Sequence, residues 1–177
     1  SDDSVDDFEL VEMREFAVSI LEAWGVDLVL AGHSHVYERS VMLDGHYGFS
    51  NTLTPEMILD GGDGKIGGDG AYQKAGQGSS PHEGAVDVVA GNGSEVFDTV
   101  VGEHPVMVTS QVVIGSVVID VDGDRLDLTA IGEDGMALDA FSIVKNTASP
   151  PVADFSGAPL SGPAPLDGSL KEEASKN

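Results

Sequence analysis

The chain has 177 residues, enough for one domain with a hydrophobic core and an additional tail. Its net charge of −23, from 31 acidic against 8 basic residues, argues against nucleic acid and anionic membranes as partners. Its lack of cysteine excludes disulfides, thiolate metal sites and cysteine nucleophiles, and no apolar run approaches the roughly 18 residues that a membrane span needs.

The first predicted element is an amphipathic helix. Apolar residues recur at helical spacing before Gly25 and predict one buried stripe. The acidic segment 2–7 suits the start of this helix, where carboxylates interact favourably with the helix dipole, and Gly25 suits its end. The residues that we expect in the core are Met13, Phe16, Ala17, Ile20, Leu21 and Trp24.

A short apolar strand follows, over residues 26–31, and breaks at Gly32. His33 and His35 come directly after this break, beyond the carboxyl end of the strand, where open α/β sheets bind their ligands. In extended backbone, side chains two residues apart share a face, so both imidazoles would point into one pocket. Neutral imidazole is a common metal ligand. The pair therefore suits one metal held by two histidines or two metals with one histidine each, and the alternative is a surface turn.

The residues around these histidines resemble a known motif. The segment 32–35, Gly-His-Ser-His, followed by Val-Tyr-Glu-Arg, is similar to the last metal-binding motif of calcineurin-like metallophosphoesterases, in particular the purple acid phosphatases. Less specific similarity extends over about residues 5–146. The resemblance implies an α/β fold in which helices flank two packed mixed sheets. This chain would supply the C-terminal part of that sandwich, one N-terminal helix followed mainly by β-strands.

The resemblance also implies a function, the hydrolysis of phosphate esters by a pair of metal ions. His33 would bind one metal and His35 the other, and the pair would be iron with zinc, manganese or a second iron. The family's Asp-x-His, Gly-Asp-x-x-Asp and Gly-Asn-His ligand motifs do not precede Gly32 in this sequence. We therefore expect the N-terminal half of the catalytic domain to be missing and the isolated chain to be inactive. Tyr37, Glu38 and Arg39 match family positions and are expected to pack and to support the histidines.

Residues 44–84 are predicted to be rich in loops. The segment 60–70 is dense in glycine and aspartate, which suggests calcium, but its spacing fits no calcium-binding repeat, so a solvated loop is the preferred interpretation. His46 is the candidate for an additional substrate-binding residue. His82 and His104 are expected to be solvated loop histidines.

The remainder of the first segment is predicted to be β-structure. A strand and a glycine turn are expected over residues 84–93. Three further strands, over 115–121, 125–131 and 137–144, are predicted to form an antiparallel meander. Asp-Gly pairs at 122–123 and 134–135 separate these strands, and such a pair is a strong hairpin signal, here for a type I′ turn.

The composition changes near residue 146, so we expect a boundary between a catalytic segment, 1–146, and a tail, 147–177. The tail begins as a proline-rich linker and then resembles the start of a PKD domain, an immunoglobulin-like module of extracellular and cell-surface proteins. One strand cannot bury a sandwich core, so disorder is expected here. The alternative for the tail is a plain proline-rich segment without a PKD domain.

The function also has an alternative. The chain could be a non-catalytic fragment, or a degenerate phosphoesterase domain of a surface adhesion protein with PKD modules.

Overall fold

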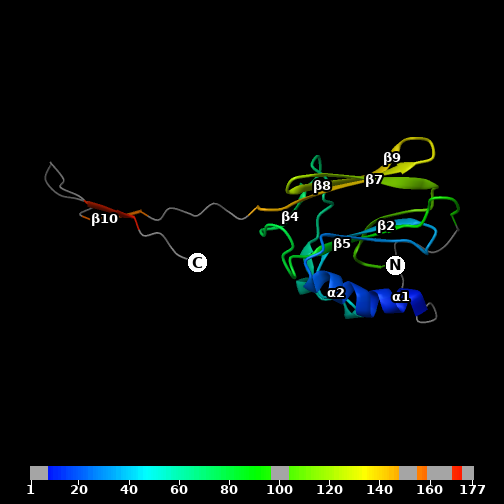
Figure 1. Ribbon diagram of the computed structural model, residues 1–177, viewed down its shortest axis with the longest axis horizontal. Helices are drawn as coiled ribbons and strands as arrows, with labels where there is room; N and C mark the ends of the chain where they lie inside the picture. Colours follow the sequence, from blue (N-terminus) through cyan, green and yellow to red (C-terminus); the bar gives the residue numbers. More distant parts are fainter. Residues whose placement is uncertain (1–7, 97–103, 148–154, 159–168, 173–177) are drawn as a thin grey trace. The chain divides into compact units, whose positions relative to one another are not determined.

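The computed structural model of the protein describes residues 8–96, 104–147, 155–158 and 169–172 (Figure 1). The chain divides into two compact units, residues 1–147 and 148–177. Among the described residues, no helix is both long and apolar enough to cross a membrane.

In the second unit, β10 (Phe155–Ala158) pairs antiparallel with β11 (Ser169–Glu172). The remaining residues of this unit lie outside the described part of the chain. Most of the predicted linker and of the PKD-like segment falls there, so both stay predictions, as does the expected disorder.

The first unit consists of two stacked sheets with a helical segment against the outer face of one of them (Figure 1). The first sheet has the strand order β1-β5-β2-β3, with β6 also paired to β2, and the second has the order β4-β9-β8-β7. The predicted α/β class is therefore confirmed. The strands of the first sheet are β1 (Leu28–Ala31), β2 (Tyr37–Leu43), β3 (Ile58–Asp60), β5 (Ala85–Ala90) and β6 (Met107–Gln111). Those of the second are β4 (Tyr72–Gln73), β7 (Gly115–Asp122), β8 (Arg125–Gly132) and β9 (Ala137–Val144).

The core lies between the two sheets. It takes apolar side chains from the inner face of each, because alternate residues of a strand point to the same side. Its buried members are Tyr37, Met42, Val86 and Val88 from the first sheet and Tyr72, Leu128, Ala130, Phe141 and Ile143 from the second.

The predicted meander is present as β7, β8 and β9. Asp122 pairs with Arg125 across a two-residue turn, as a tight hairpin requires. Only the first of the two turn residues, Gly123, has a positive φ, of 58°. This is the pattern of a type II′ turn, so the expected type I′ assignment is wrong. Asp122 belongs to the strand, and the turn itself is Gly-Asp.

The helical segment comprises α1 (Phe8–Glu12), a π-helical turn (Met13–Ala17) and α2 (Val18–Ala23). Two short 3₁₀ turns, Ser50–Thr52 and Pro55–Met57, lie between β2 and β3.

The predicted stripe of this helix is only partly correct. Phe16, Ile20 and Trp24 are 64%, 59% and 75% exposed. The sheet instead receives the neighbouring sector of the helix, which carries Leu10, Met13, Arg14 and Val18 toward the sheet and a buried Glu22 near its end. The apolar sector is wider than the face that the sheet covers, and the π-helical turn changes the helical phase midway.

A buried ion pair joins the two sheets. Arg39 on β2 donates from Nε to Asp139 Oδ2 at 2.6 Å and from Nη2 to Oδ1 at 3.0 Å. The Tyr37 hydroxyl donates to the same carboxylate, and Arg39 Nη1 donates to the Tyr72 hydroxyl. The side chains of Arg39 and Asp139 are 0% and 1% exposed. Tyr37 and Arg39 therefore act in packing between the sheets.

The polar residue that interrupts the predicted strand also has a structural partner. Asp27 precedes β1, and its carboxylate accepts hydrogen bonds from Lys74 Nζ at 2.6 Å and from Lys145 Nζ at 2.8 and 2.9 Å. Lys74 is buried and also donates to the carbonyl of Gly84. These contacts tie the start of β1 to the ends of β4 and β9.

Candidate functional site

The Gly-His-Ser-His segment forms the turn between β1 and β2. β1 and β5 run parallel, with Leu28 opposite Val86 and Ala31 opposite Val89, so their carboxyl ends lie at the same edge of the sheet. His33 and His35 follow β1 at this edge, and the segment that follows β5 begins beside them. This is the position at which open α/β sheets bind ligands.

The backbone of this turn is tightly bent. The Ser34 amide donates to the Gly32 carbonyl and the Val36 amide donates to the Ser34 carbonyl, both at 2.9 Å. His33 has a φ of 69°, in the left-handed region that non-glycine residues seldom adopt. The assumption of an extended backbone is therefore wrong, and the spacing of two residues does not by itself put both rings on one face. His33 is exposed, and the His35 side chain is 34% exposed.

The segment after β5 supports this turn. The Gly91 amide donates to the Val36 carbonyl at 3.1 Å, and a Cβ atom at Gly91 would overlap the Ser34 carbonyl oxygen. Asn92 is buried and donates from Nδ2 to the Val113 carbonyl at 2.7 Å. The end of β5 and the glycine turn after it therefore pack directly against the histidine turn. Only glycine fits at position 91, because a side chain there would overlap the Ser34 carbonyl.

The donors at this edge fit a transition metal in type but only in part in number. His33 and His35 offer two imidazoles, and the exposed Glu95 carboxylate lies 4.0 Å from His35 Nδ1. Structural and catalytic sites for such metals use at least three protein ligands. Among the described residues, His33 and His35 belong to no group of three ligands close enough to share an ion. They could therefore hold part of a metal site.

A different group does bring three potential ligands together. Ligand atoms of Glu22, Asp44 and His82 all lie within 4.8 Å of one another, and His82 Nδ1 is 3.1 Å from Asp44 Oδ1. Asp44 follows the last residue of β2, whereas the histidine turn precedes its first, so this group lies at the opposite edge of the sheet. No sequence pattern indicates this group, because its members come from three separate segments of the chain.

Glu22 is the buried member of this acidic group, 3% exposed. Its Oε2 accepts hydrogen bonds from the Tyr47 hydroxyl at 2.5 Å and from the Gly45 amide at 2.9 Å. Burial raises the pKa of Glu22, the two hydrogen bonds oppose this, and the charge of Asp44 adds to the increase. The carboxylate is thus held by the loop that follows β2.

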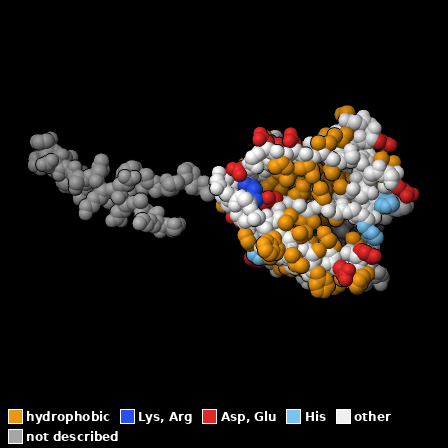
Figure 2. Space-filling view, viewed as in Figure 1, with side chains coloured by type: hydrophobic (Ala, Val, Ile, Leu, Met, Phe, Trp, Pro, Cys, Tyr) orange, Lys and Arg blue, Asp and Glu red, His pale blue; other side chains and the backbone are white. Residues whose placement is uncertain are grey.

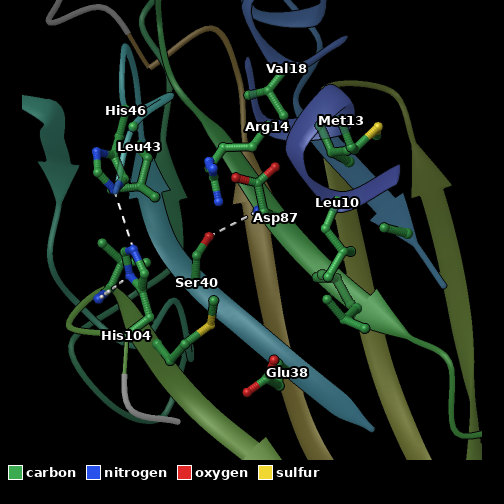
Figure 3. A pocket seen from close by; sticks show the side chains of 17 residues that line it. Leu10, Met13, Arg14, Val18, Glu38, Ser40, Leu43, His46, Asp87 and His104 are labelled. Atoms are coloured by element: carbon green, nitrogen blue, oxygen red, sulfur yellow. Dashed lines mark hydrogen bonds between the residues drawn. The ribbon is translucent and has the colours of Figure 1, made fainter. Parts of the chain in front are cut away.

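His46 lies away from the histidine turn. Its Nε2 is 3.3 Å from Nε2 of His104, and both residues line a cavity under the helix, together with Arg14 and Asp87 (Figure 3). His33 and His35 do not line this cavity. The role of His46 in substrate binding stays a prediction, and the structure does not place it beside the other two candidate residues.

The fold of the first unit consists of two stacked mixed sheets. It is similar to the structure of a purple acid phosphatase isolated from yellow lupin (Lupinus luteus) seeds, with a TM-score of 0.52 and 17% sequence identity. The similarity covers 80% of this chain and 22% of that chain, so this chain spans about a fifth of the phosphatase. No protein-family profile matches the sequence, and no curated protein does. At this identity the similarity concerns the fold.

Proposed function

We propose that His33 and His35 are metal ligands in a site that hydrolyses phosphate esters, as part of a calcineurin-like metallophosphoesterase of the purple acid phosphatase type. One observation carries the proposal. The Gly-His-Ser-His turn lies at the carboxyl edge of the parallel β1–β5 pair, in a fold similar to that of a purple acid phosphatase.

The residues of this chain would position the imidazoles. The bend at His33 and the close approach of Gly91 to Ser34 fix the backbone, and the hydrogen bond from Gly91 to Val36 joins β5 to the start of β2. When bound, a pair of ions supplies an activated water and neutralises charge on the phosphoryl oxygens. We propose iron with zinc, manganese or a second iron as the pair.

The remaining ligands would come from a further, N-terminal part of the same catalytic domain. The small share of the lupin phosphatase that this chain covers supports this proposal. We expect the isolated chain to show no hydrolysis of p-nitrophenyl phosphate, because two imidazoles do not hold a bridged metal pair. Turnover by the isolated chain that disappears in His33→Ala would contradict this expectation.

Metal binding tests the ligand assignment directly. The whole chain is titrated with Co²⁺ and the visible absorption of the bound ion is recorded. The wild-type chain should give the absorption spectrum of Co²⁺ with nitrogen ligands, and the double variant His33→Ala/His35→Ala should lose it. The matched control is His82→Ala, which removes the histidine of the acidic group at the opposite edge and should keep that spectrum. An unchanged spectrum in the double variant would reject His33 and His35 as ligands.

Phosphate binding tests the substrate class. With Mn²⁺ bound, the ³¹P resonance of inorganic phosphate should broaden in the presence of the wild-type chain, because phosphate oxygens approach the metal. The double variant should broaden it no more than free Mn²⁺ does. Metal binding at the histidines without any such broadening would leave a metal site but reject the phosphoesterase assignment.

A non-catalytic role in a surface protein is the alternative proposal. It is favoured by the finding that, among the described residues, His33 and His35 belong to no group of three ligands close enough to share an ion. We propose an extracellular or cell-surface location in either case, from the PKD-like sequence of the tail. Recovery of the protein only in cytosolic fractions of its source would reject that location.

A further inference from the structure

A cavity of about 160 Å³ lies between the helical segment and the outer face of the first sheet (Figure 3). The helical segment lines the cavity with Leu10, Met13 and Val18. The first sheet lines it from the other side, among others with Val29 of β1 and with Val106, which directly precedes β6. An apolar cavity of about 150 Å³ is large enough to bind benzene. The volume is therefore that of a small organic molecule.

One wall of this cavity carries a buried carboxylate. Asp87 lies in the middle of β5, and its Oδ1 atom is buried without a hydrogen-bond partner among the described residues. Its backbone amide donates to the Ser40 hydroxyl at 2.9 Å, which fixes the strand but leaves this oxygen unsatisfied. Burial of a charged oxygen costs free energy unless the oxygen is paired, so this position favours a ligand with a hydrogen-bond donor.

Other ionisable side chains also line the cavity. Glu38 projects from β2 into the same space and is fully buried, with the Ser110 hydroxyl donating to its Oε1. Arg14 also lines the cavity, but its guanidinium lies over the Phe49 ring, and no ion pair within 4.0 Å joins it to Asp87 in the described structure. Two carboxylates, one guanidinium and the imidazoles of His46 and His104 thus line the cavity, and Asp87 is the carboxylate that a donor would satisfy.

A metal ion fits this cavity less well than an organic cation. Among the described residues, Asp87 belongs to no group of three metal ligands, and most of the lining is hydrocarbon.

The π-helical turn Met13–Ala17 lies against the cavity, and such turns are frequent at functional sites.

We propose that this cavity binds a small organic cation, an ammonium group on an apolar body of about the size of benzene. The ammonium donates to Asp87, and the apolar body contacts Leu10, Met13 and Val29. The site is separate from His33 and His35, so it stands or fails independently of the phosphoesterase proposal.

Benzylamine is the probe that tests the site, with benzyl alcohol as the neutral molecule of the same shape. Binding to the whole chain is measured by calorimetry and by changes in amide chemical shifts. Benzylamine should shift the amides of β5 and of the π-helical turn and bind at least tenfold more tightly than benzyl alcohol. Equal affinity of the two probes would overturn the assignment of a cation site.

Two variants separate charge from shape. Asp87→Asn keeps the side-chain shape and should weaken benzylamine binding at least tenfold without changing that of benzyl alcohol. Ala31→Leu places extra volume in the cavity and should abolish both. The control Asp122→Asn removes one exposed charge far along the chain in β7 and should change neither. Benzylamine binding that survives both Asp87→Asn and Ala31→Leu would overturn the proposal.

Discussion

At the scale of single residues, the buried Arg39–Asp139 ion pair connects the two sheets. Burial alone would raise the pKa of Asp139, but the hydrogen bonds and the charge of Arg39 outweigh it and lower the pKa. The carboxylate therefore remains ionised in the folded protein. The pKa of Asp139 is lower in the folded than in the unfolded protein. Its contribution to stability is therefore complete above the pKa of an unfolded aspartate and is lost as the pH falls from that value through the folded pKa.

Truncation of Arg39 should destabilise the protein strongly. Arg39→Ala leaves the Asp139 charge buried without its main partner, which costs about 3–5 kcal/mol of unfolding free energy. The matched control is Arg125→Ala, which breaks the Arg125–Asp127 pair, whose side chains are 42% and 41% exposed. An exposed pair contributes about 0–1 kcal/mol. Urea unfolding measures both, and equal losses would contradict this account of the buried pair.

Asp87 shows the opposite electrostatic situation. Burial, followed by the negative charge of Glu22, raises its pKa to about 6 from the ordinary 3.8. An acid whose pKa is higher in the folded state is more easily ionised when unfolded, so ionisation at neutral pH destabilises the fold by about 3 kcal/mol. This penalty is absent below the unfolded pKa and complete above the folded pKa.

Removal of the Asp87 charge should therefore stabilise the protein. We expect Asp87→Asn to raise the unfolding free energy by about 1–3 kcal/mol near neutral pH and by less near about pH 4, where the wild-type carboxyl is protonated. Urea unfolding at both pH values measures this, with Asp122→Asn as the exposed control. A gain that is equal at the two pH values would show that the charge of Asp87 is not its cause.

At the scale of elements, the histidine turn depends on the segment after β5. Gly91 lies against the Ser34 carbonyl, so an added methyl group requires one of the two backbones to move. The turn thus belongs structurally to two strands, β1 and β5, that are far apart in the sequence but parallel and adjacent in the sheet.

Gly91→Ala should displace this turn. We expect a loss of about 1–3 kcal/mol of stability from overpacking, together with weaker Co²⁺ binding at His33 and His35. The matched control is Gly93→Ala, because a Cβ atom at Gly93 meets nothing within 4 Å. Urea unfolding and Co²⁺ titration measure the two effects. Wild-type behaviour of Gly91→Ala in both would contradict the role of the close approach.

At the scale of the whole molecule, net charge and exposed apolar surface oppose each other. Figure 2 shows hydrophobic side chains gathered on one face of the first unit, with acidic side chains at its margins. The exposed large apolar residues include Phe16, Ile20 and Trp24 of the helical segment and Leu30 of β1. Apolar surface of this kind promotes association, whereas the net charge of −23 opposes it.

Salt should stabilise the folded chain. Raising NaCl from about 0.01 M to about 0.5 M shortens the range of charge repulsion from about 30 Å to a few ångströms, so the melting temperature should rise. Choline chloride at the same ionic strength should act similarly if screening is the cause. Thermal unfolding followed by circular dichroism measures the change. A melting temperature that is unaffected by both salts would contradict a dominant role of charge repulsion.

Several elements were predictable because their signals are local. The hydrophobic run before Gly32 predicts β1, and the Asp-Gly pairs with alternating strands predict the meander of β7, β8 and β9. The position of His33 and His35 beyond a strand end is likewise a property of adjacent residues. Local sequence was insufficient for backbone detail, since the turn at Gly123 is type II′ and the histidine segment is bent rather than extended.

The sequence by itself determined the α/β class, the meander of β7, β8 and β9 and the Gly-His-Ser-His segment at the end of a strand. Only the tertiary structure decided which sector of the helix faces the sheet, because packing and the π-helical turn choose among several apolar faces. It also brought Glu22, Asp44 and His82 together, paired Arg39 with Asp139 and enclosed Asp87 under the helix. These contacts join residues that are distant in the chain, and side-chain burial depends on which elements stack, which no local pattern records.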